Sequence, residues 1–127
     1  MLELLKRKFW VKGAISFEKD DKIEIEKRTI QFIESFLKLN KIKDKDIILM
    51  MIIAPAELHS AYPCTFIRKK GFKFPCMTFS DINVYGSPQN ILRFIVHCKS
   101  YKRVKDLYLE EALKLKEILD KNLNLNT

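Results

Sequence analysis

The residue best placed to do chemistry in this sequence is Arg93, a permanent cation inside the apolar run of residues 91–96. A turn-like stretch, residues 80–88, precedes that run and contains Asp81. Placing a guanidinium in a β-rich hydrophobic segment is costly unless an anion meets it. The anion is either a protein carboxylate such as Asp81 or a bound ligand. The sequence leaves both interpretations open, because structural ion pairs imitate functional sites.

A few other polar side chains lie on or beside expected strands, and they are Lys12, Thr78 and Tyr108. Lys12 stands within Trp-Val-Lys-Gly-Ala at 10–14, so it is a second cation in a strand-like segment. The simpler interpretation is that Lys12 points to water while Arg93 and Asp81 pair structurally. The functional interpretation is that these side chains converge on an anionic ligand.

Other kinds of site have little support in the sequence. With three glycines there is no Gly-rich phosphate loop, and His59 and His97 are far apart without a spaced acidic partner for a metal. Cys76, beside Pro75 in an expected strand, is more typical of a buried core residue than of a nucleophile. His59 is likewise typical of a helix-surface or packing position. We therefore expect no metal and no nucleophilic catalyst.

Composition predicts one domain, residues 1–127, with 1–8 as an N-terminal extension and 120–127 as a flexible tail. The net charge of +8 comes from lysines spread along the chain, which is typical of a solvated surface and favours encounter with small anions over nucleic acid. The longest apolar run, 47–54, is too short to span a membrane. Three cysteines without a CxxC motif, and no signal peptide, predict reduced thiols and a cytoplasmic protein.

The elements that must position these residues follow from local patterns. Strands are predicted over 9–16, 46–54, 72–80 and 90–99. One helix is predicted from the cap at Asp20 and Asp21 to Asn40, with Arg28 on its solvent face, and a second from Pro55 to the stop at Gly71. Residues 106–119 fit either a helix or an irregular strand. The order indicates an α+β domain with a mixed sheet and two main helices.

Several of these segments resemble the monofunctional AroH-class chorismate mutases, the small trimeric kind. Val-Lys-Gly-Ala at 11–14 is similar to the family's opening Arg-Gly-Ala strand, and Ala-Glu-Leu-His-Ser-Ala-Tyr-Pro at 56–63 to its Pro-Asp-Leu-His-Ala-Val-Phe-Pro segment. Residues 75–93 keep the spacing from the family's strand to its essential arginine. Tyr-Leu-Glu at 108–110 resembles another family element and favours a strand there. The resemblance runs over residues 11–119.

The resemblance implies a trimeric pseudo-barrel, related to ferredoxin-like folds, that rearranges chorismate to prephenate in phenylalanine and tyrosine biosynthesis. This intramolecular Claisen rearrangement needs no cofactor, metal or covalent intermediate. The substrate is a dianion, so fixed cations and hydrogen-bond donors suffice to hold its compact conformer and stabilise charge on the breaking ether oxygen. The partners implied are chorismate and two further copies of the chain, with neither nucleic acid nor membrane.

Carried over residue by residue, the resemblance implies that Arg93 donates to the ether oxygen and a carboxylate. Lys12 binds a carboxylate where the family has Arg, and Tyr108 donates to a carboxylate. Asp81 accepts from the ring hydroxyl where the family has Glu, and Thr78 assists where it has Cys. Lysine loses the bidentate fork of arginine, and aspartate reaches one methylene less far. Retention of Arg93 favours activity.

Three further residues are implied to line the pocket, namely Tyr62, Arg68 and Leu115, with Tyr62 and Arg68 coming from the neighbouring subunit. Two alternatives stay open: a catalytically weak or repurposed trimeric relative, such as an enamine-deaminase-like enzyme, and a non-catalytic protein that binds small anions. The Lys12 strand and the Tyr-Leu-Glu element argue against the enamine deaminase. Aromatic residues do not interleave with basic ones on a surface strand, which argues against nucleic acid.

Overall fold

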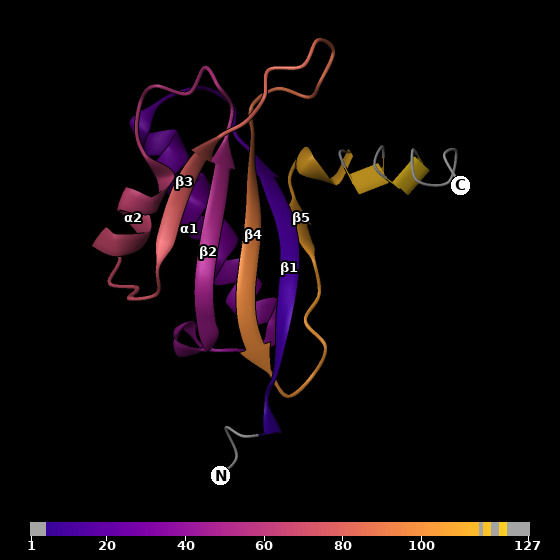
Figure 1. Ribbon diagram of the computed structural model, residues 1–127. Coiled ribbons are helices and arrows are strands. Elements are labelled where there is room, and N and C mark those ends of the chain that lie inside the picture. The colour runs from indigo at the N-terminus through magenta and orange to yellow at the C-terminus, as the bar shows by residue number, and fades with distance from the viewer. Residues whose placement is uncertain (1–4, 115, 118–119, 122–127) are drawn as a thin grey trace.

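The sheet of this protein is mixed and runs in the order β3-β2-β4-β1-β5 (Figure 1). The structure is a computed structural model that describes residues 5–114, 116–117 and 120–121. Antiparallel pairing joins β4 to both β1 and β2, whereas β1–β5 and β2–β3 pair in parallel. The strands are β1 (Arg7–Ser16), β2 (Ile47–Ala54), β3 (Cys76–Ser80), β4 (Ile91–Ser100) and β5 (Leu107–Leu109). The predicted α+β mixed sheet is confirmed.

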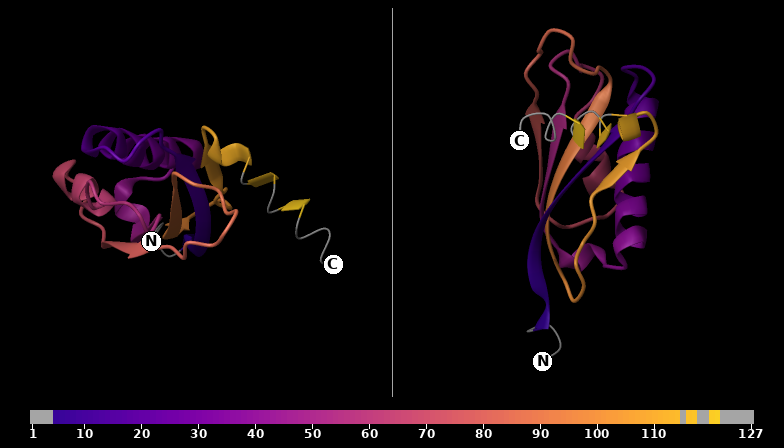
Figure 2. Two further views of the ribbon diagram at one scale, coloured as in Figure 1. Left: turned by 90° about the horizontal axis from the view of Figure 1, so that it is seen from above. Right: turned by 90° about the vertical axis from the view of Figure 1, so that its right-hand side faces the viewer.

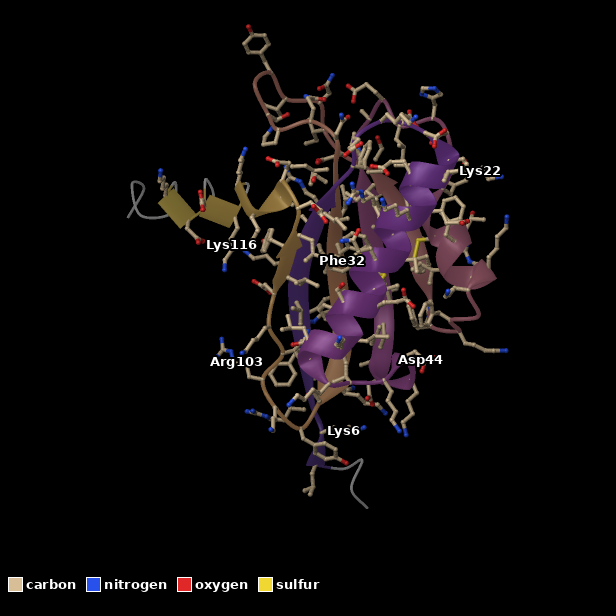
Figure 3. The ribbon with its side chains drawn as sticks, turned by 180° about the vertical axis from the view of Figure 1, so that it is seen from behind. Lys6, Lys22, Phe32, Asp44, Arg103 and Lys116 are labelled. Carbon is tan, nitrogen blue, oxygen red and sulfur yellow. A yellow bond between two sulfur atoms is a disulfide. The ribbon has the colours of Figure 1, made fainter. Side chains whose placement is uncertain are left out.

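Both helices, α1 (Lys22–Asn40) and α2 (Pro63–Lys69), lie on the same face of the sheet (Figure 2). The central strand β4 alternates strictly, so that Leu92, Phe94, Val96 and Cys98 are buried against the helices. Phe32, near the middle of α1 (Figure 3), stacks on Phe94 with ring centroids 3.7 Å apart. The hydrophobic core therefore lies between the helices and one face of the sheet.

Neither of these helices covers the opposite face of the sheet (Figure 2). Much of that face is nevertheless apolar. Trp10 of β1 is 61% exposed, and Met77 and Phe79 of β3 are also exposed. Ile53 of β2 and Ile95 of β4 lie between them and are only partly buried. An apolar face of this size on a small domain marks an interaction surface.

The first helix begins as its sequence predicts. Asp21 caps α1 by accepting a hydrogen bond from the Glu24 backbone N–H at 3.2 Å, and Lys41 closes the helix in a left-handed conformation with φ of 53°. The prediction that Arg28 faces solvent is wrong, because its side chain is buried under acidic groups from three segments of the chain. Periodicity placed Arg28 on the polar face but could not show what packs against that face.

The second helix begins later than predicted. Residues 55–62 form turns, and Pro63, not Pro55, takes the first helical position of α2. The backbone N–H groups of His59 and Ser60 donate to the carboxylate of Asp20 at 2.9 and 3.0 Å. These bonds fix the loop beside the residues that precede α1. The predicted stop at Gly71 is confirmed by its φ of 102°. The predicted strand from residue 72 begins only at Cys76.

Both alternatives for the C-terminal segment are partly realised. Residues 107–109 form the parallel strand β5, as the family resemblance favours, whereas residues 112–114 are helical, as periodicity favours. At the other end, Arg7 and Lys8 belong to β1, so the predicted extension over 1–8 is wrong for those two residues. Of the predicted tail, residues 120 and 121 are helical and 122–127 lie outside the described residues.

Two of the three cysteines are not the reduced thiols that we predicted. Cys64 of α2 and Cys76 of β3 form a disulfide, with Cα atoms 5.8 Å apart. Their sequence separation of 12 gave no hint, because only the packing of α2 beside β3 brings them together. Cys98 stays a free thiol whose pKa is raised to about 11 by burial and by Asp46. No helix in the described part of the chain meets the length and apolarity that a membrane span requires.

Candidate active site

Arg93 lies near the start of the central strand β4, on the face that the helices leave open. Its neighbours across the sheet are Ala14 of β1 and Ile53 of β2. The Nε atom of Arg93 is 3.5 Å from Oδ2 of Asp81, and the two side chains are 38% and 35% exposed. An ion pair this long and this exposed is worth about 1 kcal/mol or less. Asp81 therefore occupies only part of the Arg93 guanidinium, and the remaining N–H donors of Arg93 can bind a further anion.

Asp81 is held by its own loop. Its backbone N–H donates to the carbonyl of Ala54 at 2.7 Å, and its Oδ1 accepts from the N–H of Ile82 at 2.8 Å. The cleft that Arg93 and Asp81 line has a volume of about 20 Å³. A cavity of that size holds roughly one water molecule. One chain by itself consequently does not enclose a ring-sized ligand at Arg93.

Tyr108 lies on the same face as Arg93. It stands opposite Ala14 in the parallel β1–β5 pair and is buried against Ala14, Ile91 and Ala112. Burial raises the pKa of its phenol, and the carboxylates of Asp106 and Asp120 raise that pKa further, whereas Arg93 opposes them. The phenol is therefore a protonated hydrogen-bond donor at neutral pH, within electrostatic range of Arg93.

Lys12 belongs to this face as well, because it lies two residues before Ala14 on β1. Its exposed side chain lines a groove of about 950 Å³, together with Trp10 and Ile95. The backbone N–H of Lys12 donates to Oδ1 of Asp106 at 3.1 Å, which fixes the segment that leads into β5. Arg103 and Lys116, both labelled in Figure 3, line the same groove but were not among the predicted site residues. The only available signal was their charge, which nothing local distinguishes from that of other cations.

The remaining candidates lie on the other face and at the other edge of the sheet. Thr78 of β3 pairs with the buried Ile52, so it points toward the helices, and its hydroxyl is buried without a hydrogen-bond partner among the described residues. Thr78 and Tyr62 line one cavity of about 530 Å³. Nearby, Nη2 of Arg68 donates to the carbonyl of Cys76 at 2.9 Å.

The candidate residues therefore form two sets within one chain. The cation set comprises Arg93, Lys12 and Tyr108, and the edge set comprises Thr78, Tyr62 and Arg68. Three strand spacings, about 14 Å across the sheet, separate Thr78 on β3 from Lys12 on β1, and Thr78 points to the helix side of the sheet. Asp81 contacts the cation set. Leu115 lies outside the described residues.

Comparison with known proteins shows the family to which the chain belongs. The family model for chorismate mutase type I matches residues 9–119. The chain belongs to the type I chorismate mutase family. It is similar to the chorismate mutase AroH of Bacillus subtilis (strain 168), at 25% identity over 92% of this chain and 94% of the relative. The chorismate mutase AroH of Thermus thermophilus is 27% identical over 87% of this chain and 94% of that relative.

A solved structure of a chorismate mutase from Clostridium thermocellum shares the fold of this chain. The two superpose with a TM-score of 0.78 at 24% sequence identity, over 82% of this chain and 96% of the other. The similarity of fold therefore extends over most of the chain and is not confined to short motifs. The chorismate mutase family identity is confirmed, and the chain is an isomerase of aromatic amino acid biosynthesis.

Proposed function

We propose that this chorismate mutase rearranges chorismate to prephenate in sites that two neighbouring chains of a homotrimer build together. The rearrangement is the reaction of the family to which residues 9–119 belong. The shared site is supported by one observation above others: Thr78, Tyr62 and Arg68 lie at the β3 edge of the sheet, whereas Lys12 and Tyr108 lie on the strands of the opposite edge. A substrate of one ring cannot reach from one edge to the other within one chain.

A ring of chains removes this separation. Tyr108 lies on the edge strand β5 and Lys12 on its neighbour β1, whereas Thr78 lies on the opposite edge strand β3. When each chain applies its β3 edge to the β1–β5 edge of the next, the same contact repeats and closes into a ring. The apolar face that carries Trp10, Met77 and Phe79 is then the inner face of a trimer.

In such a site the residues act as follows. Arg93 donates to the ether oxygen, where negative charge develops as the C–O bond breaks and the new C–C bond forms. Lys12 and Tyr108 bind carboxylate oxygens of the dianion. Asp81, beside Arg93, accepts from the ring hydroxyl. Thr78 supplies its unpartnered hydroxyl from the neighbouring chain. No proton needs to move, because bond breaking and bond making occur within the substrate.

Tyr62, Arg68 and Leu115 complete the proposed pocket. Tyr62 and Thr78 already share a cavity. The guanidinium of Arg68 uses Nη2 for the carbonyl of Cys76, which leaves its other nitrogens for the substrate. Leu115 supplies apolar contact in this proposal.

The direct test is the loss of chorismate absorbance when purified protein is added, with prephenate identified as the product. Turnover well above the spontaneous rate is expected, together with a sedimentation coefficient of a trimer. Absence of turnover would favour the repurposed alternatives, an enamine-deaminase-like enzyme or a binder of small anions. A stable monomer at micromolar concentration would contradict the shared site.

The proposed location is the cytoplasm. The Cys64–Cys76 disulfide is unusual there, since that compartment keeps most thiols reduced. Rapid acid quenching of cells, followed by alkylation and mass spectrometry, measures whether the two sulfurs are paired in the native protein. Fractionation of the same cells tests the location itself.

A further inference from the structure

Arg28 is a charged residue that the fold buries. It lies on α1 and is only 9% exposed. Its Nε donates to Oε2 of Glu24 at 3.1 Å, and its Nη1 donates to Oε1 of Gln31 at 3.3 Å. Glu18 approaches Nη2 at 3.9 Å. A buried guanidinium is tolerated only when acceptors meet its N–H donors. Glu24 and Gln31 of α1, together with Glu18 before it, face this guanidinium.

The fourth contact of Arg28 joins α1 to the segment that follows β5. Nη1 of Arg28 lies 3.4 Å from Oε1 of Glu110, and Nε2 of Gln31 donates to that same oxygen at 3.0 Å. Glu110 directly follows β5 and is separated from Gln31 by 79 residues. Figure 2 shows α1 and β5 side by side. The carboxylate of Glu110 is therefore clamped to the helix by a cation and an amide.

Glu110 also has an uncommon backbone. Its φ of 58° lies in the left-handed region, which costs energy for a residue with a side chain. The carbonyl of Glu110 accepts from the N–H of Leu113 at 3.1 Å, which starts the helical turn. That turn brings Ala112, which is fully buried, onto Tyr108. The next N–H, of Glu111, donates to Oγ of Ser16 on β1 at 2.9 Å.

The contacts of Glu110 and its neighbours lie at the ends of the short strand β5. β5 consists of three residues paired with residues 13–15 of β1, and Tyr108 is its middle residue. A strand of that length holds few ladder hydrogen bonds of its own, so its position depends on what anchors its ends. Asp106 anchors one end through the backbone of Lys12, and Glu110 anchors the other. We propose that Glu110, clamped by Arg28 and Gln31 of α1, is the positioning residue that sets where the Tyr108 phenol meets the substrate.

This inference rests on the proposed function for its kinetic readout. Glu110→Gln keeps the shape of the side chain and removes the charge that Arg28 contacts. We expect kcat/KM for chorismate to fall about tenfold, the equivalent of one charge-assisted hydrogen bond. Glu111→Gln is the matched control, because the Glu111 carboxylate pairs only with the exposed Lys114 among described partners. That variant should stay within about twofold of the parent, as expected of an exposed pair.

A second background separates positioning from general damage. In Tyr108→Phe protein there is no phenol to aim, so Glu110→Gln should change kcat/KM less than about twofold there. If Glu110→Gln lowers kcat/KM by the same factor in Tyr108→Phe protein as in the parent, the role of Glu110 is merely structural and the inference is overturned. Glu110→Gly, which suits the left-handed backbone, serves if the Gln variant fails to fold. Full activity of the Gly variant would likewise overturn it, since the turn would then suffice without the carboxylate.

Hydrogen exchange gives a readout that does not need turnover. Glu110→Gln should speed exchange of the backbone amides of 107–110 and leave those of β4 unchanged. Unchanged exchange at 107–110 would refute the clamp. If the parent protein lacks mutase activity while this exchange effect appears, the proposed function fails and the clamp survives.

Discussion

Mixing two inactive variants should restore about one quarter of the parent activity, if each site takes its residues from two chains. The first variant, Arg93→Ala, removes the cation aimed at the ether oxygen. The second, Arg68→Ala, removes the cation beside Cys76 in the edge set. Neither variant alone contains an intact site. In a mixed ring, a chain that keeps Arg93 can adjoin a chain that keeps Arg68, and that junction is complete.

The magnitude follows from the arrangement. Arg93→Ala should cost about 3 kcal/mol of transition-state stabilisation, or roughly a hundredfold in rate, as for loss of an oxyanion-type donor. Its fold should persist, because the ion pair with Asp81 is long and more than one-third exposed. After random mixing in equal amounts, half of the chains keep Arg93 and half of their neighbours keep Arg68. About one junction in four is then intact, whatever the number of chains in the ring.

The assay is chorismate consumption after the two variants are unfolded together, refolded and separated by size. Native mass spectrometry of the same sample shows whether mixed assemblies formed. A mixture of Arg93→Ala with Lys12→Met is the matched control, since both changes fall in the cation set and no junction becomes complete. Mixed assemblies that stay as inactive as the separate variants would refute the two-chain site.

Three further predictions concern single features. Lys12→Arg should lower KM about fivefold, near 1 kcal/mol, because a planar fork binds a carboxylate better than an ammonium; full turnover by Lys12→Met would remove Lys12 from the site. Gly13→Ala should lower the unfolding free energy by about 1–3 kcal/mol in chemical denaturation, because the added methyl meets the Leu107 carbonyl and the Phe32 ring; an unchanged midpoint would contradict this close packing. Acid should destabilise the fold through Glu24, whose pKa is held below its usual 4.5 by the N–H of Glu18 and by Arg28, against the effect of burial. This stabilisation is complete above pH 4.5 and is lost as pH falls through the lowered pKa, so Glu24→Gln should flatten the acid limb of stability against pH.

Much of the local structure was predictable from local chemistry. Asp21 as a cap and Gly71 as a stop need only neighbouring residues, and both predictions are confirmed. The alternation along β4 depends on the two-residue period of a strand, which any sheet shares. The segment 106–119 was harder, because its leucines satisfy both periods, and the chain uses one for β5 and the other from Ala112 onward.

Sequence motifs indicated the members of the candidate site but not their layout. Family motifs pointed to Lys12, Thr78, Asp81 and Arg93, and the structure brings Asp81 to Arg93. The register of β3 on β2 turns Thr78 to the helix face, and only pairing with Ile52 reveals this. Strand register is a long-range property, because moving it by one residue exchanges the faces of the whole strand.

The sequence by itself determined most of the element types, most of their ends and the chemical character of the candidate site, since these depend on residues within a few positions of one another. Tertiary structure alone decided that Arg28 is buried, that Cys64 meets Cys76 and that Glu110 is clamped to α1. Each of these contacts joins segments distant in the chain. Whether each contact forms depends on which elements pack together and on whether pairing offsets the cost of desolvating a buried charge, which no local pattern records.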